Sequence, residues 1–148
     1  MTLRAVHFIA IVFAALALVP AGAHLFALPN KINMGQGQYF TAQSIYSGWA
    51  LLGIVLIGAL IANGALAFMI RDETGPLMFA LAAVLCFAAS LVVFFIWVFP
   101  ANQATNNWTA VPADWRGLRI RWEYGHAVSA ILGFAALCFT TLAALTRQ

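Results

Sequence analysis

Two histidines, an arginine and an asparagine are the side chains of this sequence best suited to acid–base chemistry inside an apolar protein. They are His24, His126, Arg119 and Asn102. Histidine exchanges protons near neutral pH, while arginine and asparagine donate hydrogen bonds to a developing anion. The chain is 64% hydrophobic and only 7% charged, and polar groups within a membrane protein mark functional sites. All four fall at the same end of the apolar segments, hence at one depth in the membrane, so we expect their side chains to converge on one cavity and take them as the catalytic candidates.

A polar face begins the last apolar segment of the sequence. Arg119, Glu123 and His126 are spaced four and three residues apart, so a helix places them on one side. A stripe of small residues runs beside this face: Gly125, Ser129 and Gly133. Because such a stripe lets a second helix approach closely, we expect the polar face to point into a helix bundle rather than into lipid.

Tryptophans gather at the same end of the apolar segments. The five are Trp49, Trp97, Trp108, Trp115 and Trp122. Some tryptophans serve as anchors at the membrane interface, but interfacial belts normally form on both sides, and this distribution is one-sided. A flat apolar substrate would stack on such rings. We expect the substrate-binding residues to be Trp108, Trp122, Trp115 and Glu123.

Glu123, His126 and His24 are also candidates for a metal site. Glu-x-x-His is the spacing found in carboxylate-rich di-iron bundles, but such a centre needs a second motif and more carboxylates than the four acidic residues of this chain provide. A single metal ion held by these three residues, or a haem held by the two histidines, stays an alternative. In a purely structural reading, Glu123 pairs with Arg119 or His126 and fastens the helix.

Four apolar segments must position these residues. They run roughly over residues 3–28, 46–70, 77–99 and 122–145. Each is long enough to cross a hydrocarbon core of about 30 Å as a helix, and little chain remains for a soluble domain. We expect residues 1–148 to form one all-α transmembrane domain, a four-helix bundle with a partly structured loop between the third and fourth helices.

The ends of the segments carry further signals. The first segment resembles a signal peptide as far as Ala21-Gly22-Ala23, but its apolar run continues, so we expect a retained helix that Pro29-Asn30 ends. Gly35 and Gly37 then predict a flexible loop. Asp114 is expected to be the N-cap of a short helix that leads into the last segment.

The charges and cysteines narrow the class of protein. The net charge of +3 forms no basic tract, so no nucleic-acid partner is expected. Four spans place both termini on one side, and if Arg119 and Arg121 belong to a site, the positive-inside rule predicts cytoplasmic termini in a bacterial inner membrane. Cys86 and Cys138 are expected to be small buried apolar residues.

The lipid bilayer is the expected partner of the protein. A homo-oligomer and a larger membrane complex are further options.

One stretch of the sequence also resembles a known family. It comprises Phe99-Pro100-Ala101-Asn102-Gln103, Asn107-Trp108, and the run from Pro112 to His126, in which Arg119-x-x-Trp122-x-x-x-His126 begins the last segment. These residues are similar to the DUF1772 family, which includes the anthrone oxygenases. The resemblance covers mainly the last third of the chain. It implies a small four-helix membrane oxygenase that acts on polycyclic phenolic substrates, some members needing neither metal nor flavin.

The sequence thus predicts a small membrane oxidoreductase of anthrone-oxygenase type that acts on an apolar aromatic molecule. His126 or His24 would remove a phenolic proton, and Arg119 with Asn102 would stabilise the anion. On the resemblance no cofactor is required. Two other classes stay open: a redox protein that binds a metal or haem, and a non-catalytic accessory subunit of a larger membrane complex.

Overall fold

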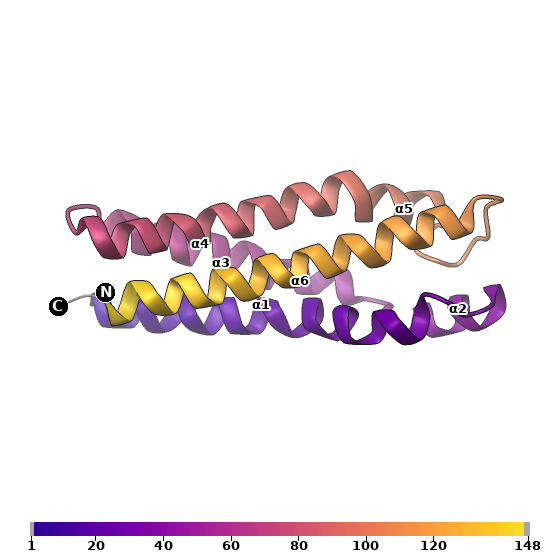
Figure 1. The fold of residues 1–148 in the computed structure, drawn as a ribbon, viewed down its shortest axis with the longest axis horizontal. Helices are drawn as coiled ribbons and strands as arrows, with labels where there is room; N and C mark the ends of the chain where they lie inside the picture. Colours follow the sequence, from indigo (N-terminus) through magenta and orange to yellow (C-terminus); the bar gives the residue numbers. More distant parts are fainter. Residues whose placement is uncertain (1, 147–148) are drawn as a thin grey trace.

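Four long apolar helices lie side by side in the computed structural model, which describes residues 2–146 (Figure 1). The spans long and apolar enough to cross a membrane are Leu3–Lys31, Trp49–Met69, Thr74–Ala104 and Trp115–Leu145. The predicted all-α four-helix bundle of membrane type is therefore confirmed. The first span begins and the last span ends at the same end of the bundle. The opposite end, which carries the loop of residues 105–114, is here named the distal end.

Helix α1 (Leu3–Lys31) is longer than the sequence predicts. The prediction that Pro29-Asn30 ends it is wrong, because the helix reaches Lys31 and the Ile32 N–H still bonds the Leu28 carbonyl at 2.9 Å. A proline removes only its own backbone donor, and so close to the end of the helix the loss is a single bond. The extra turn carries the side chain of Lys31 into the bundle.

A short helix, α2 (Gln36–Gln43), replaces the flexible loop that the glycines predict. Gly35 is its N-cap, in an extended conformation. Helices this short are not stable on their own and depend on tertiary contacts. Here Tyr39 supplies them, because its side chain is completely buried at the distal end of the bundle.

The second span begins with irregular turns. Two 3-10 turns, η1 (Ser44–Tyr46) and η2 (Trp49–Leu52), precede helix α3 (Gly53–Met69). Between the two turns Gly48 has a φ of 82°, which glycine adopts without a steric cost. The predicted helix of residues 46–70 is thus α-helical only from Gly53 onward, and the turns before it place aromatic side chains at the distal end.

The third span consists of three helical segments joined end to end. They are α4 (Thr74–Val93), the π-helical η3 (Phe94–Val98) and α5 (Phe99–Ala104). In η3 the Phe99 N–H bonds the Phe94 carbonyl, five residues back. The span is longer at both ends than the predicted range of residues 77–99. The π-helical segment separates the part that builds the bundle from α5, which carries Asn102.

Helix α6 (Trp115–Leu145) forms the fourth span and begins well before the predicted residue 122. Asp114 is its N-cap, as predicted, but its side chain makes no capping bond. The short helix predicted before the last segment is therefore the beginning of α6 itself. The loop of residues 105–114 contains several turns, in agreement with the partly structured loop expected there.

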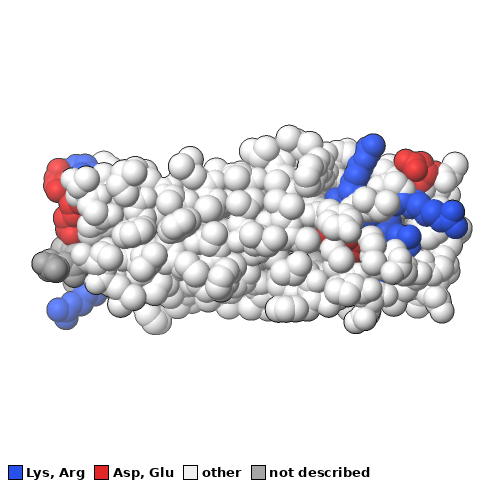
Figure 2. All heavy atoms as spheres, in the orientation of Figure 1, with Lys and Arg blue, Asp and Glu red and all other residues white. Residues whose placement is uncertain are grey.

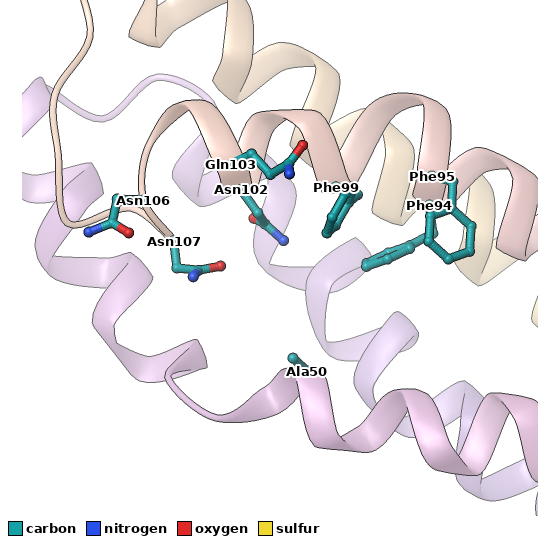
Figure 3. A pocket seen from close by; sticks show the side chains of 8 residues that line it. All are labelled: Ala50, Phe94, Phe95, Phe99, Asn102, Gln103, Asn106 and Asn107. Atoms are coloured by element: carbon teal, nitrogen blue, oxygen red, sulfur yellow. The ribbon is translucent and has the colours of Figure 1, made fainter.

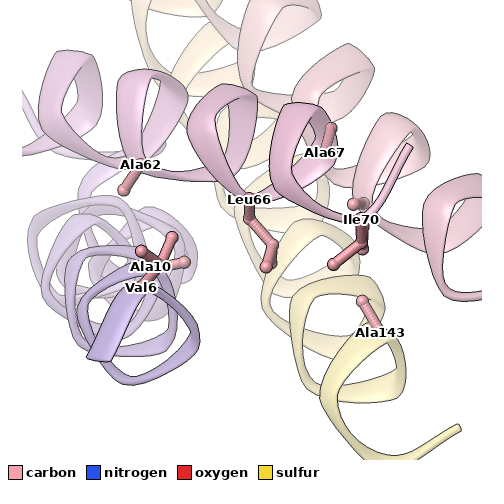
Figure 4. Packing of buried hydrophobic residues seen from close by; sticks show 8 residues of the cluster. Val6, Ala10, Ala62, Leu66, Ala67, Ile70 and Ala143 are labelled. Carbon is pink, nitrogen blue, oxygen red and sulfur yellow. The ribbon is translucent and has the colours of Figure 1, made fainter. Parts of the chain in front are cut away.

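Small residues allow the helices to approach closely. Helix α1 contacts α3 and α6, and α4 contacts the same two helices, so the four form a ring. Near the termini, Leu66 and Ile70 of α3 lie between Val6 of α1 and Ala143 of α6 (Figure 4). Several alanines are completely buried in the bundle: Ala10, Ala14, Ala59, Ala80, Ala83, Ala136 and Ala143. Close backbone contact of this kind is the usual means of helix association in membranes.

The glycine stripe of α6 contacts other helices, as predicted, but its two glycines face different partners. A Cβ added at Gly125 would lie 2.8 Å from Cγ2 of Val98, whereas one added at Gly133 would lie 3.6 Å from Cδ1 of Leu18. We expect Gly125→Ala to be less stable than Gly133→Ala by about 1–3 kcal/mol, because only the first overpacks a buried contact while both gain helix propensity. Thermal unfolding of the two variants in detergent measures the difference, and equal stabilities would contradict the close contact.

The surface of the bundle is that of a protein surrounded by lipid. Charged side chains gather at the two ends, and the middle of the face shown in Figure 2 carries none. The prediction that both cysteines are buried is wrong, since Cys86 is half-buried and Cys138 is exposed. Cys86 packs against the edge of a core cluster, whereas Cys138 is exposed, where an apolar thiol is compatible with lipid.

Candidate functional site

The polar face of α6 points into the bundle, as its spacing predicts. Glu123 is 1% exposed and Arg119 is 9% exposed, while His126 is half-buried. Groups of this kind are costly to bury unless they are paired. Their partners come from the end of α1, from α2 and from the turns before α3.

His24 and His126 stack on each other although they belong to different helices. Their ring centroids are 4.0 Å apart and their planes differ by 24°. The indole of Trp122 stands edge-on to both rings, 4.9 Å from His24 and 4.3 Å from His126. His24 is buried, and its Nδ1 has no hydrogen-bond partner among residues 2–146. The predicted proximity of the two histidines is confirmed.

The turns before α3 complete the aromatic surroundings of His24. The ring of Tyr46 lies 4.3 Å from the imidazole, and that of Trp49 lies 5.6 Å from it. Tyr46 also contacts Trp122 at 5.8 Å. An imidazole enclosed by aromatic rings loses most of its contact with water, so this histidine pair has an apolar environment.

Asn102 joins two tryptophans through a single oxygen atom. Its Oδ1 accepts hydrogen bonds from the indole N–H of Trp122 at 2.8 Å and of Trp108 at 3.2 Å. Trp108 reaches this position through an unusual turn, in which three consecutive residues have positive φ angles: Asn106 (47°), Asn107 (54°) and Trp108 (64°). Residues other than glycine adopt this conformation at a steric cost, and such strain clusters at functional sites.

A network of charged and polar groups lies next to the histidine pair. Nζ of Lys31 is 3.0 Å from Oε1 of Glu123, and the Tyr39 hydroxyl donates a hydrogen bond of 3.0 Å to the same oxygen. Gln43 in turn donates from Nε2 to the Tyr39 hydroxyl oxygen. Burial, reinforced by the Glu123 carboxylate, raises the pKa of Tyr39. The phenol therefore stays protonated and acts as a donor to the carboxylate.

Arg119 lies outside the histidine pair. Its Nη1 donates a hydrogen bond of 2.8 Å to the Met34 carbonyl, and its guanidinium lies over the rings of Trp115 at 4.8 Å and Tyr39 at 5.3 Å. Of the four residues expected to converge on one cavity, only Asn102 lines the pocket described next; Arg119, His24 and His126 do not. Arg119 anchors the segment after α1, because a planar guanidinium stacks readily on aromatic rings.

A pocket of about 500 Å³ opens beside Asn102 (Figure 3). Ala50 stands across from α5, and three aromatic side chains form the apolar wall: Phe94, Phe95 and Phe99. Amides form the other wall: Asn102, Gln103, Asn106 and Asn107. None of these lining residues is charged. The pocket is open, since most of its lining residues are exposed, and it offers stacking surfaces together with neutral hydrogen-bond donors and acceptors.

No protein-family model, no curated protein and no solved structure matches this chain. The resemblance of residues 99–126 to the DUF1772 family therefore stays a prediction from the sequence.

The geometry does not favour the metal alternative. Imidazole nitrogens bind metals along their ring planes at about 2.0–2.1 Å, so two ligands must converge on one point. The rings of His24 and His126 are instead stacked face to face, with planes that differ by only 24°. Within residues 2–146 no three His, Cys, Asp or Glu side chains form a group that could hold a metal ion. The set of His24, His126 and Glu123 is thus not supported as a metal site.

Two residues of the network were not identified from the sequence. Lys31 was assigned to a loop because Pro29-Asn30 precedes it, and Tyr39 lies in a segment with glycines and no apolar periodicity. One signal was present, since His24 and Lys31 are seven residues apart and two helical turns place them on the same side. The structural reading of Glu123 named Arg119 or His126 as its partner, whereas its partners are Lys31 and Tyr39.

The remaining tryptophans have different surroundings. Trp108, Trp115 and Trp122 are buried and pack with Tyr39 in one cluster. Trp49 is half-buried, and Trp97 is exposed on η3. Trp97 is therefore suited to the role of an interfacial anchor, while Trp122 is the ring that contacts both histidines.

Replacing Asn102 with alanine should destabilise the distal end by about 1–3 kcal/mol, because two indole N–H groups lose their common acceptor. Gln103→Ala is the matched control, since this neighbouring amide is exposed. Urea unfolding in detergent, followed by tryptophan fluorescence, compares the two variants. If both unfold at the same urea concentration as the unsubstituted protein, the shared hydrogen bonds contribute nothing to stability.

Proposed function

We propose that this protein is a small membrane oxidoreductase of anthrone-oxygenase type, acting on an apolar aromatic substrate at the distal end of the bundle. The observation that carries the proposal is that one tryptophan and one asparagine link the histidine pair to a pocket. The stacked His24 and His126 contact Trp122, and Trp122 is hydrogen-bonded to Asn102, which lines the pocket. The Trp122 indole and the Asn102 side chain therefore lie between the acid–base pair and the pocket, and a substrate must approach Trp122 to reach a histidine.

The pocket suits a neutral, planar molecule that arrives from lipid. Its phenylalanines stack against rings, and its amides hydrogen-bond a carbonyl or hydroxyl group. Apolar side chains of the same third span are exposed next to it, including Phe95 and Ile96. A hydrophobic substrate dissolved in the bilayer reaches such a site without crossing water.

The chemistry follows from the acidity of a hydroxylated polycyclic substrate. His126 or His24 takes a proton from the substrate and leaves an electron-rich anion. Molecular oxygen adds to the carbanion form at its ring carbon, and a proton completes a hydroperoxide. Loss of water then converts the ring CH₂ group to a carbonyl, so that one O₂ supplies one oxygen to the product and one to water. The apolar surroundings of the histidines keep bulk water away from this intermediate.

The test is direct oxidation of anthrone by the purified protein in detergent. Oxygen consumption and anthraquinone formation are followed together, with a visible absorption spectrum and a metal analysis of the same sample. We expect equal amounts of oxygen consumed and quinone formed, above the rate in empty micelles. A haem spectrum would favour the redox-carrier alternative, and stable co-purifying subunits without turnover would favour the accessory-subunit alternative.

A further inference from the structure

Lys31 is the buried cation of the distal end, and its hydrogen-bonding capacity is largely unused. The residue is 4% exposed, although lysine is almost never buried unless it is paired. Its ammonium lies 3.0 Å from Oε1 of Glu123. Within the described part of the chain, however, none of its three N–H donors makes a well-directed hydrogen bond. Apart from the contact with Glu123, the donors of this ammonium thus stay available to a ligand.

The ammonium group and the histidine pair share two aromatic walls. Nζ of Lys31 lies 4.5 Å from the ring centre of Tyr46 and 5.0 Å from that of Trp122. The same two rings lie 4.3 Å and 4.9 Å from the imidazole of His24, and Trp122 also contacts His126 at 4.3 Å. The ammonium and His24 thus border the same two rings, so an anion held against these rings beside the histidine also lies near the positive charge.

The other positively charged residue near the site, Arg119, already has protein partners. Arg119 donates to the Met34 carbonyl and stacks on Trp115 and Tyr39. Glu123 itself keeps a second partner, because Tyr39 donates to it independently of the lysine. Lys31 can thus redirect donors toward a ligand without leaving the carboxylate unpaired.

We infer that Lys31 is the anion-stabilising residue of the site, donating hydrogen bonds to the oxyanion of a hydroxylated aromatic molecule after a histidine has taken its proton. The identity of the substrate class rests on the proposed function. The step moves one proton from the substrate hydroxyl to an imidazole nitrogen and breaks no other bond. A positive charge within about 4–6 Å favours the ionised form of the hydroxyl, and in an apolar site it does so more strongly than in water.

The experiment uses 2-hydroxyanthraquinone, whose visible absorption changes when its hydroxyl ionises. The dye is titrated with base in the presence of the purified protein and in empty detergent micelles. We expect the apparent pKa of the dye to be lower by at least about one pH unit with the protein. The variant Lys31→Met/Glu123→Gln removes both charges of the pair and should return the pKa to the micelle value. Lys31→Arg should keep it low, and so should Arg119→Met.

The variants separate the possible outcomes. If this double variant does not fold, Lys31→Met combined with Glu123→Leu answers the same question, because it also removes both charges of the pair. If the dye keeps its lowered pKa in a variant that lacks both charges of the pair, the inference is overturned. It is also overturned if the dye has the same pKa with the unsubstituted protein as in empty micelles. Loss of the effect in Arg119→Met would assign the role to Arg119 instead. Because the titration needs no turnover, a lowered dye pKa without anthrone oxidation contradicts the proposed function and supports the role of Lys31.

Discussion

Replacing Glu123 with alanine should lower the free energy of unfolding by about 3–5 kcal/mol, because it leaves the ammonium of Lys31 buried without its counter-charge. Tyr39 loses its acceptor in the same variant. The carboxylate is therefore the residue whose removal should damage the distal end most. Urea unfolding in detergent micelles, followed by tryptophan fluorescence, measures the change.

Two further variants show whether the ion pair is the cause. Lys31→Met combined with Glu123→Leu removes both charges and should recover most of the lost stability, since an apolar pair of similar size often replaces a buried ion pair without loss. Asp72→Ala removes a carboxylate from an exposed pair with Arg71 at 4.0 Å, and it should change stability by about 0–1 kcal/mol. A double variant as unstable as Glu123→Ala would show that the ion pair is not what stabilises this end.

The second large effect concerns activity. His126→Ala should reduce anthrone oxidation by about 10²–10⁴-fold, the range that a positioned general base contributes. The fold should survive, because the neighbouring contacts of Trp122 with Asn102 and Trp108 do not involve the imidazole. Oxygen consumption is compared between variants at equal amounts of folded protein.

His7→Ala is the matched control for this experiment. His7 is also buried in α1, but it lies near the termini, where its Nδ1 is 3.2 Å from the Leu3 carbonyl. It should keep full activity. If His126→Ala and His7→Ala oxidise anthrone equally fast, the histidine pair is not the base, and His24→Ala then shows whether either imidazole takes part.

The sequence was sufficient to predict the bundle because a membrane simplifies the problem. Long apolar runs have one way to satisfy their backbone groups, as helices, and their lengths match the hydrocarbon core. The 3.6-residue period then placed Glu123 and His126 on one face of α6, and the common depth of His24 and His126 brought the two histidines together.

The parts that the sequence did not predict depend on contacts between distant segments. Lys31 continues a helix past a proline, and its partner Glu123 is on the fourth span. Tyr39 gives a short helix its stability through the same carboxylate, 84 residues away along the chain. Local patterns carry no information about such partners. For the same reason the depth argument could not show that Arg119 turns toward Met34.

The π-helical segment η3 (Phe94–Val98) changes the helical register between α4 and α5. The side chains of α5 therefore point in other directions than they would in an uninterrupted α-helix. A π-turn holds about one residue more than an α-turn, so the faces before and after it are out of phase by about 100°. Removing one residue from this segment would restore a regular helix and turn Asn102 away from Trp122, while α4 stayed in place. The length of this segment, rather than the identity of any one residue, thus determines which side chain of α5 faces Trp122. A single insertion or deletion there would give the pocket a different wall.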